Sequence, residues 1–337
     1  MQELWRKYKL RVLRKNALWR SFRARRQLTA LRVQSDEIRQ GALLCVMCVR
    51  NESVRLPYFL DYYRKMGVDH FLIVDNDSTD GTTEYLMSKA DTSVWATSAS
   101  YKAARFGLDW TTWLQIKYAR SKWCLTLDAD ELLVIPHNGK RSLKDLTHHL
   151  DTINQRAFGA IMLDMYPKGP IDSVDYQVGD DPIKTLRWFD AGPYRSSRQL
   201  PKENLWVQGG VRERVFFASD PSKGPTLNKL PLVKWDARFA YTNSTHSMLP
   251  AKMNHAYSGP GGSEVSGVLL HTKFLQIAVE KSLEDRHRKQ HFGNPDAFQD
   301  YYDAVIAAPD LWCKDSVEYT GADQLLALKM MSQGDWA

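Results

Sequence analysis

The chain has 337 residues, of which 43% are hydrophobic and 25% charged, so it can bury the full core of an ordinary globular protein. Its formal net charge of +7 is uneven. Residues 1–40 hold 12 of the 46 basic and 3 of the 39 acidic residues, which leaves 34 basic and 36 acidic residues elsewhere. No segment approaches the ~20 apolar residues that span a bilayer. These features exclude a membrane-spanning helix and predict a soluble or peripherally attached protein.

The basic segment 1–40 predicts an amphipathic helix. Its apolar residues recur near helical spacing, with Lys and Arg between them: Trp5, Tyr8, Val12, Trp19 and Phe22. Such a helix can lie on an anionic membrane surface. A helix packed against the domain, or a disordered basic arm, is the alternative. Nucleic acid is not predicted as a partner because the rest of the chain is not basic. No apolar core of about 7–15 residues follows the charges, which argues against a targeting peptide.

Short apolar strands alternate with helices over residues 43–127. We expect strands at 43–49, 70–74, 93–96 and 123–127, and helices at 56–65, 82–88 and 109–119, the last capped by Asp109. This alternation predicts an α/β fold with a mostly parallel, doubly wound sheet and flanking helices. Ligands of such sheets gather beyond the carboxyl ends of the strands, where Asn51, Asp75 and Asp128 stand.

An acidic run, Asp128-Ala129-Asp130-Glu131, follows the fourth predicted strand. On a strand the i, i+2 spacing places Asp128 and Asp130 on one face. Two carboxylates in this position suit Mg²⁺ or Mn²⁺ bound together with substrate phosphates. Glu131 points to the other face, where a structural salt bridge is the expected role. A solvated turn is the alternative interpretation of the pair.

Three motifs in this order resemble the family 2 nucleotide-sugar glycosyltransferases of the GT-A fold, of bacterial type. They are Cys48-Val49-Arg50-Asn51-Glu52, then Val74-Asp75-Asn76-Asp77-Ser78-Thr79-Asp80-Gly81-Thr82, then Asp128-Ala129-Asp130. The resemblance covers roughly residues 42 to 290. It implies a GT-A domain over 41–290, with a donor-binding half at 41–136 and an acceptor half at 137–290. The remaining segments are the basic segment 1–40 and a C-terminal helical extension at 291–337.

The resemblance also implies site residues. Asn51, Glu52 and Asp75 match positions that hold the base and ribose, with Asp128 beside them. His271, after an apolar run, matches a late histidine that reaches the metal ion from the far side of the site. His246 competes for that role, and a hydrogen-bonded core histidine is the other interpretation of His271.

Two further assignments concern the phosphates and the catalytic base. Arg105 lies in a loop that suits phosphate binding, although a surface arginine is equally compatible. The family often carries its acidic base as Glu-Asp well beyond the metal motif, and this chain has no such pair there. Glu213, between Arg212 and Arg214, is the candidate base. Asp190 and Asp236 are rivals for this role. Because the Glu-Asp pair is missing, the sequence leaves open whether the transfer inverts the configuration of the sugar.

The second half of the chain is less regular. We expect strands at 159–163, 184–188, 214–217, 231–235 and 265–270, long loops at 164–182 and 190–210, and helices from 274 onward, the last at 323–332. The four cysteines form no disulfide framework, so Cys45 and Cys48 are expected to be core thiols in a reducing cytoplasm.

These observations together predict a hexosyltransferase-like enzyme with Mn²⁺ or Mg²⁺ as cofactor. It would transfer sugar from a nucleotide-diphosphate sugar, UDP-sugar favoured, to a glycan or lipid-linked acceptor in cell-surface polysaccharide synthesis at the inner face of a membrane. A nucleotidyltransferase is a second alternative, but it would carry a Gly-rich, basic loop after the first strand, which this sequence does not have. A haloacid-dehalogenase-like phosphatase would carry its Asp-x-Asp after the first strand. A non-catalytic membrane-associated scaffold is the third alternative.

Overall fold

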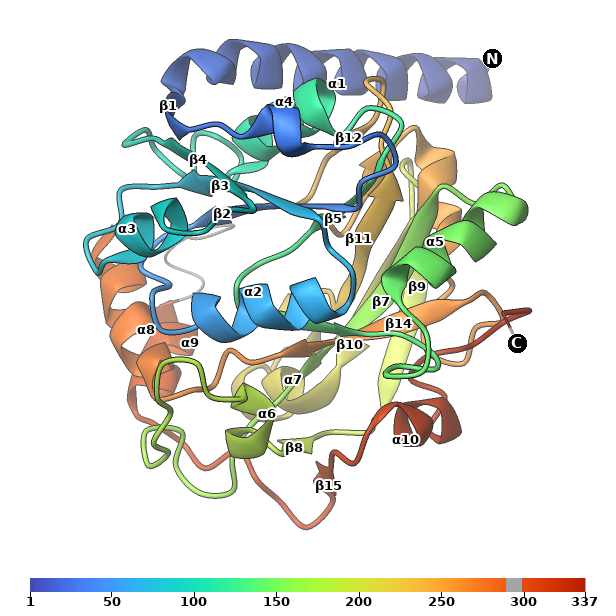
Figure 1. Ribbon diagram of the computed structural model, residues 1–337. Helices are drawn as coiled ribbons and strands as arrows, with labels where there is room; N and C mark the ends of the chain where they lie inside the picture. Colours follow the sequence, from blue (N-terminus) through green and yellow to red (C-terminus); the bar gives the residue numbers. More distant parts are fainter. Residues whose placement is uncertain (289–298, 337) are drawn as a thin grey trace.

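The computed structural model describes residues 1–288 and 299–336 and is built around one large sheet (Figure 1). In this part of the chain the sheet has nine strands in the order β1-β4-β3-β2-β5-β11-β7-β14-β6. Their bounds are β1 Thr29–Arg32, β2 Leu44–Val49, β3 His70–Asp75, β4 Thr92–Ala96, β5 Trp123–Thr126, β6 Glu131–Val134, β7 Ala157–Asp164, β11 Asn228–Lys234 and β14 Ser266–His271.

The sheet is mixed but mostly parallel. Strands β4, β3, β2 and β5 run parallel to one another. Strand β11 runs antiparallel to both of its neighbours, β5 and β7, and β14 is parallel to β7. Six strands therefore share one direction: β4, β3, β2, β5, β7 and β14. The two edge strands, β1 and β6, run the opposite way. A mixed α/β architecture with a large, mostly parallel sheet is therefore confirmed.

The first half follows the predicted alternation closely. Helix α2 (Leu56–Lys65) has the predicted bounds, with Pro57 in its first turn and an apolar face that includes Leu56, Phe59 and Tyr63. Helices α3 (Thr82–Met87) and α4 (Leu108–Tyr118) follow β3 and β4. The predicted cap of α4 is wrong. Gly107, at φ 75°, precedes the helix, and Asp109 lies in its first turn with its carboxylate bound to arginines.

Helices cover both faces of the sheet (Figure 1). Helix α4 lies on the upper face as drawn, and the N-terminal helix α1 (Gln2–Ala24) lies outside α4. Helix α2 lies on the lower face. The predicted basic helix is thus present and packed against the domain. Among the described residues, no helix has the combined length and apolar character that a membrane crossing requires.

The second half departs from prediction at three places. Residues 184–188 were expected to form a strand, but residues 184 and 185 end helix α6 (Pro182–Thr185), and only Trp188 lies in a strand. The Asp181 carboxylate accepts the Ile183 N–H at 3.0 Å at the start of that helix. Residues 214–217 lie mostly in helix α7 (Gly210–Phe216). The expected loop at 190–210 contains a hairpin of β9 (Tyr194–Gln199) and β10 (Asn204–Gly209).

Other helices and strands of the described residues lie around the sheet, besides short 3₁₀ turns at η1 Arg25–Gln27, η2 Ser35–Glu37 and η3 Pro221–Lys223. They are α5 Leu143–Thr152, β8 Trp188–Phe189, β12 Ala240–Tyr241, β13 Met248–Leu249, the 3₁₀ helix η4 Ala251–Ala256, α8 Ile277–Arg288, α9 Gln299–Ile306, β15 Val317–Glu318 and α10 Ala322–Ala327. The C-terminal region is not wholly helical, since β15 pairs with β8. The last helix ends before residue 332, where the chain returns to β14 through the Ser266 N–H and the Ser332 carbonyl.

All four cysteines are free. Cys45 and Cys124 are fully buried, and Cys48 is half-buried. Burial raises the pKa of the Cys45 and Cys48 thiols, so both are held in the neutral form. This agrees with the prediction that they are core thiols.

Candidate functional site

Four polar side chains at the carboxyl edge of the sheet come from three different strands and one turn. Asp75 ends β3, Asp164 ends β7, His271 ends β14, and Asp130 lies in the turn between β5 and β6. Asp164 and His271 are paired in register on adjacent parallel strands. The topology therefore brings together residues that are 107 positions apart in the sequence.

A chain of alternating charges crosses this edge, and we call it the His271 chain. The Nε2 atom of His271 lies 3.2 Å from Oδ2 of Asp130, and its Nδ1 atom lies 2.6 Å from Oδ1 of Asp164. Arg212 of α7 donates from Nε to Oδ2 of Asp164 at 2.7 Å. Asp164 and His271 expose less than a tenth of their side chains, whereas Asp130 exposes 23%. The chain is therefore open to solvent mainly at Asp130.

The pKa values along the His271 chain are set by mutual attraction against burial. Burial alone would raise the pKa of Asp130, but His271 outweighs it and holds that pKa well below its usual range. In the same way Arg212, followed by His271, lowers the pKa of Asp164 to about 2. Burial would lower the pKa of His271, but Asp130 and Asp164 raise it. Both carboxylates are therefore ionised at neutral pH.

The acidic run does not behave as a strand pair. Strand β5 ends at Thr126, so Asp128 and Asp130 lie in a turn and the expected common face is wrong. Asp128 is bound instead by Nζ of Lys229, 3.0 Å from its Oδ2, and exposes 55% of its side chain. Asp128 and Asp130 therefore point to different partners.

Glu131 forms the predicted salt bridge, and its partner is Lys229 on β11. We call Asp128, Glu131 and Lys229 the Lys229 cluster. Glu131 and Lys229 are almost completely buried. Burial raises the pKa of Glu131 to about 7, against the attraction of Lys229. Burial would lower the pKa of Lys229, but Asp128 and Glu131 outweigh it and raise the value. This cluster satisfies its charges internally.

The Asp130 and His271 pair has the geometry of two neighbouring metal ligands. Adjacent ligands of an octahedral ion that lie about 2.1 Å from it are about 3 Å apart, close to the 3.2 Å observed. Metal-bound histidines commonly donate their other ring nitrogen to a carboxylate, which Asp164 provides here. Within residues 1–288 and 299–336, no three potential ligand side chains converge on one point. Substrate phosphates and water would have to complete the shell, as Mg²⁺ commonly requires.

Of the candidate nucleoside-binding residues, Asp75 is the one with a carboxylate oxygen left to accept a hydrogen bond from a ligand. Its Oδ1 accepts the Ser78 N–H at 3.0 Å, while its buried Oδ2 has no hydrogen-bond partner among the described residues. Asn51, at φ 51°, is engaged: its side-chain oxygen accepts the Thr79 N–H at 2.9 Å. Glu52 is bound by Arg55 and by Lys281 of α8.

Helix α8 covers the end of β2. Glu284 accepts from Nε of Arg50 at 2.8 Å, and Nδ2 of Asn51 lies 3.4 Å from its other oxygen. Lys281 of the same helix reaches Glu52. The helix that follows His271 therefore contacts two of the three residues that the sequence assigned to the nucleoside.

Arg105 has a structural environment. Its guanidinium donates from Nε to Asp109 at 2.7 Å and from Nη1 to the Tyr241 carbonyl at 3.0 Å. Arg105 and Phe106 both have positive φ, at 52° and 58°, so the loop before α4 is tightly turned. These contacts connect the loop with α4 and β12, and the Arg105 side chain faces Asp109.

Glu213 lies on α7, next to Arg212 of the His271 chain. Its Oε1 is paired with Arg195 of β9 at 2.5 Å, and its buried Oε2 has no hydrogen-bond partner among the described residues. Arg212 and Arg214 face Asp164 and Asp190, so neither of these neighbours holds the Glu213 carboxylate.

The rival residues are also engaged. Asp190 is bound by Arg214 and Tyr166, and Asp236 by Arg238 and Arg156. His246, the competing histidine, is half-buried beside the Lys229 cluster, with Nδ1 2.5 Å from the Asn228 carbonyl. It does not join the His271 chain.

Sequence reasoning missed Asp164 and Lys229 and saw Arg212 only as a neighbour of Glu213. Asp164 carries the same signal as Asp75, an aspartate that ends an apolar parallel strand, and could have been found by it. Lys229 had a weaker signal, a cation within a mostly apolar strand.

Comparisons with known proteins do not assign a family. No family model matches the chain, and no curated protein matches it. One solved structure that matches is the crystal structure of HddC from Yersinia pseudotuberculosis, which is 8% identical. The match covers 73% of this chain and 99% of that chain, with a TM-score of 0.29. A likeness at that level carries no argument about fold or function.

Proposed function

We propose that the protein is a metal-dependent glycosyltransferase with a GT-A, family 2-like fold. It would transfer a sugar from a nucleotide-diphosphate sugar, with a UDP-sugar as the first choice, to a glycan or lipid-linked acceptor in cell-surface polysaccharide synthesis. The proposal depends above all on one observation. Asp130, from the acidic run, lies 3.2 Å from His271, which comes from the far end of the domain and is oriented by Asp164.

The residues of the His271 chain have separate tasks in this proposal. A bound Mn²⁺ or Mg²⁺ would neutralise the charge that develops on the departing diphosphate. Asp130 supplies the ionised carboxylate at the open end of the chain. Asp164 holds the His271 ring in one orientation, and Arg212 keeps Asp164 ionised. The site is thus ordered before the ligand arrives, which lowers the cost of binding.

Asp75 is the proposed contact to the nucleoside. A buried carboxylate oxygen without a donor costs about 1–3 kcal/mol or more, and a ligand donor would remove that cost. The N3–H of uracil or a ribose hydroxyl is such a donor. Glu213 stays the predicted base, and its unpaired Oε2 is the atom that would accept the proton of the acceptor hydroxyl. Asn51, Glu52 and Arg105 have structural contacts and carry less of the proposal.

The test is hydrolysis of a panel of nucleotide sugars by the full chain, with Mn²⁺ and with a chelator. We expect at least one donor to be turned over only with the metal. Asp130→Asn should reduce that turnover about 100-fold or more, because it removes the charge that would face the cation. Calorimetry should show UDP binding that requires Mn²⁺ and is lost in the same variant.

Asp172→Asn is the matched control, since Asp172 is an exposed carboxylate in the loop after β7. This variant should keep the turnover and the UDP binding of the parent. The proposal is rejected if no donor is turned over, if turnover is indifferent to chelator, or if both variants behave alike.

A further inference from the structure

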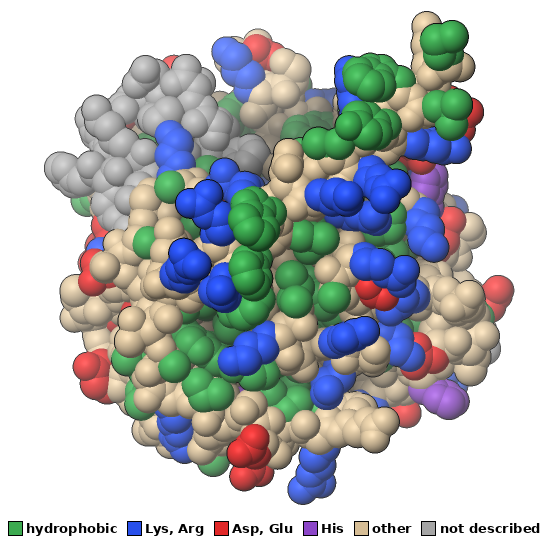
Figure 2. Space-filling view, turned by 90° about the horizontal axis from the view of Figure 1, so that it is seen from above, with side chains coloured by type: hydrophobic (Ala, Val, Ile, Leu, Met, Phe, Trp, Pro, Cys, Tyr) green, Lys and Arg blue, Asp and Glu red, His purple; other side chains and the backbone are tan. Residues whose placement is uncertain are grey.

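Helix α1 presents a stripe of apolar side chains to the solvent. Trp5, Tyr8, Val12 and Trp19 expose 57%, 57%, 37% and 59% of their surface. Their spacings of three, four and seven residues place them on one helix face, which we call the α1 stripe. A surface helix ordinarily turns its apolar face to the core. Here that face points outward (Figure 2).

The opposite face of α1 is fixed to the domain. Ala17, Ser21 and Ala24 are buried there, against α4. Arg20 donates to Asp109 at 3.1 Å and to the Ala103 carbonyl at 2.7 Å. These anchors set the rotation of the helix, so the outward direction of the α1 stripe is a property of the folded domain.

The same helix region is strongly basic. Residues 1–28 contain ten Lys and Arg and one acidic residue, Glu3. Ion pairs within the described chain account for three of the ten, namely Arg6, Lys7 and Arg20. The remaining seven have no carboxylate partner there: Lys9, Arg11, Arg14, Lys15, Arg23, Arg25 and Arg26. Lys and Arg side chains accordingly surround apolar ones on this face (Figure 2).

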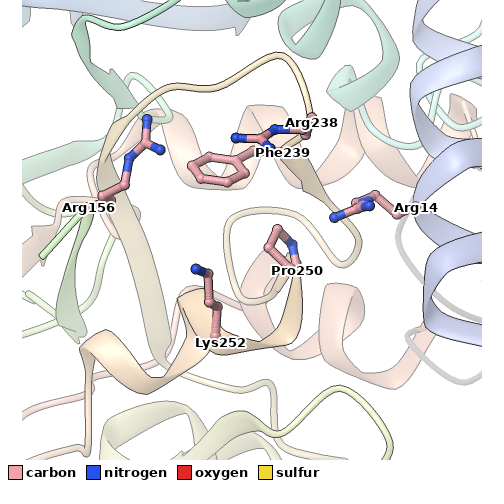
Figure 3. A pocket seen from close by; sticks show the side chains of 6 residues that line it. All are labelled: Arg14, Arg156, Arg238, Phe239, Pro250 and Lys252. Carbon is pink, nitrogen blue, oxygen red and sulfur yellow. The ribbon is translucent and has the colours of Figure 1, made fainter. Parts of the chain in front are cut away.

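A cationic cavity of about 200 Å³ lies beside the helix (Figure 3). It is lined by Arg14 of α1, Arg156, Arg238, Phe239, Pro250 and Lys252. Asp236 offsets part of this charge through Arg238, at 2.8 Å, and Arg156, at 3.7 Å. Arg14 and Lys252 have no carboxylate partner in the described chain. The cavity suits a phosphate group, which guanidinium and ammonium groups bind. It lies on the side of α1 that faces the domain, because Arg14 is three and seven residues before the buried Ala17 and Ser21.

We propose that the outward face of α1 docks on an anionic phospholipid bilayer, with the α1 stripe at headgroup level and the exposed cations that flank it, such as Arg11 and Lys15, against lipid phosphates. Tryptophan and tyrosine favour the membrane interface, and clustered cations are attracted to anionic headgroups. A nucleic acid is a less favourable partner, because it would gain little binding free energy from Val12 and the two tryptophans. These side chains form a continuous apolar line along more than three turns of the helix. The docking concerns a surface remote from Asp130 in sequence and does not depend on glycosyl transfer.

The experiment is co-sedimentation of the full chain with vesicles, without nucleotide or metal. Vesicles of phosphatidylcholine alone are compared with vesicles that also contain phosphatidylglycerol, at about 0.15 M salt. We expect binding only to the anionic vesicles. Trp5→Ser with Trp19→Ser should weaken it about tenfold or more. Arg11→Ala with Lys15→Ala, which removes two exposed cations beside the stripe, should weaken it about fivefold for each cation removed.

Lys65→Ala with Lys314→Ala is the matched control, because both lysines are exposed and lie near α2 and β15, on the far side of the molecule from α1 (Figure 1). This variant loses the same charge and should bind as the parent does. Thermal melting confirms that each variant is folded. Equal binding to neutral vesicles, unchanged binding of the stripe variant, or equal loss in the Arg11/Lys15 variant and the control variant would overturn the proposal. Binding of RNA in place of vesicles, weakened by the same substitutions, would also overturn it.

Discussion

The His271 chain and the Lys229 cluster begin in the same acidic run but differ in whether they leave a charged group accessible to a ligand. In the Lys229 cluster, one buried ammonium is held by two carboxylates, and the buried Glu131 exposes only 1% of its side chain. In the His271 chain, the terminal carboxylate of Asp130 exposes 23% of its side chain and stays ionised. One cluster is closed by its own partners, and the other ends at a group that a cation can reach.

This difference shows how a turn can separate the roles of neighbouring carboxylates. Asp130 and Glu131 are adjacent in sequence, yet one faces His271 on β14 and the other faces Lys229 on β11. The two partners come from strands β11 and β14, about a hundred or more residues further along the chain. The role of each carboxylate is therefore decided by the strand order of the sheet. Substitutions in the two clusters should accordingly affect different properties.

The largest effect is expected for Lys229→Met. Removing the ammonium leaves Glu131 buried without a compensating charge, and breaking a buried ion pair from one side costs about 3–5 kcal/mol. We expect a loss of this size in the free energy of unfolding, measured by urea denaturation. The protein that stays folded should keep metal-dependent nucleotide binding, because Asp130 and His271 are untouched.

The double variant Lys229→Met with Glu131→Gln is the control. It removes both buried charges, so it should recover much of the lost stability. If the single and double variants were equally unstable, the loss would come from packing around Lys229 and not from an unpaired carboxylate.

How much could be predicted from the sequence also differs along the chain. The parallel strands and helices of the first half carry clear periodic signals, and α2 was predicted to the residue. Short βα units have local determinants, such as Pro57 in the first turn of α2, that act within a few residues. The large, mostly parallel sheet follows from this alternation.

The second half contains elements whose signals are weak or ambiguous. Strand β9 is polar and mostly exposed, so residues 194–199 show no alternation of apolar and polar side chains. The run at 214–217 is short and apolar, and periodicity alone cannot distinguish a strand from a helix there. Asp181 and Pro182 are a helix start that was overlooked.

The candidate site was predicted in composition more than in geometry. The sequence singled out Asp130 and His271, which the structure brings together, and Asp75 at the neighbouring strand end. It could not show that Asp128 turns to Lys229, because that depends on the turn after Thr126 and on β11. For a similar reason the sequence could not show that Arg105 pairs with Asp109, which lies one helical turn further along.

A smaller effect is expected for Asp164→Asn, which tests the His271 chain without altering its open end. The amide still accepts a hydrogen bond from His271 but lacks the charge that orients and polarises the ring. Loss of such a supporting carboxylate typically costs 10–100-fold in metal affinity. We expect the Mn²⁺ concentration that half-saturates UDP binding to rise by this factor, while saturating Mn²⁺ restores most of the binding.

Asp190→Asn provides the comparison, since Asp190 is also buried and paired with an arginine but lies outside the His271 chain. Its Mn²⁺ dependence should match that of the parent. A parallel shift in both variants would mean that Asp164 acts through general stability, and the positioning role would be withdrawn.

The smallest effect concerns the pH dependence contributed by His246, beside the Lys229 cluster. Burial, followed by the charge of Lys229, lowers its pKa to about 3. A histidine in the unfolded chain has a pKa of about 6.5, so between these values the unfolded state binds a proton that the folded state does not. The stability contribution is therefore complete above about pH 6.5 and is lost as the pH falls. At about pH 5.5 the loss should be about 1.4 kcal/mol relative to neutral pH.

His246→Asn should remove this part of the acid sensitivity in urea titrations, because the amide can still donate to the Asn228 carbonyl but does not titrate. Other titrating groups are common to both proteins and cancel in the difference, so identical pH profiles would show that His246 has the same pKa in the folded and unfolded chain.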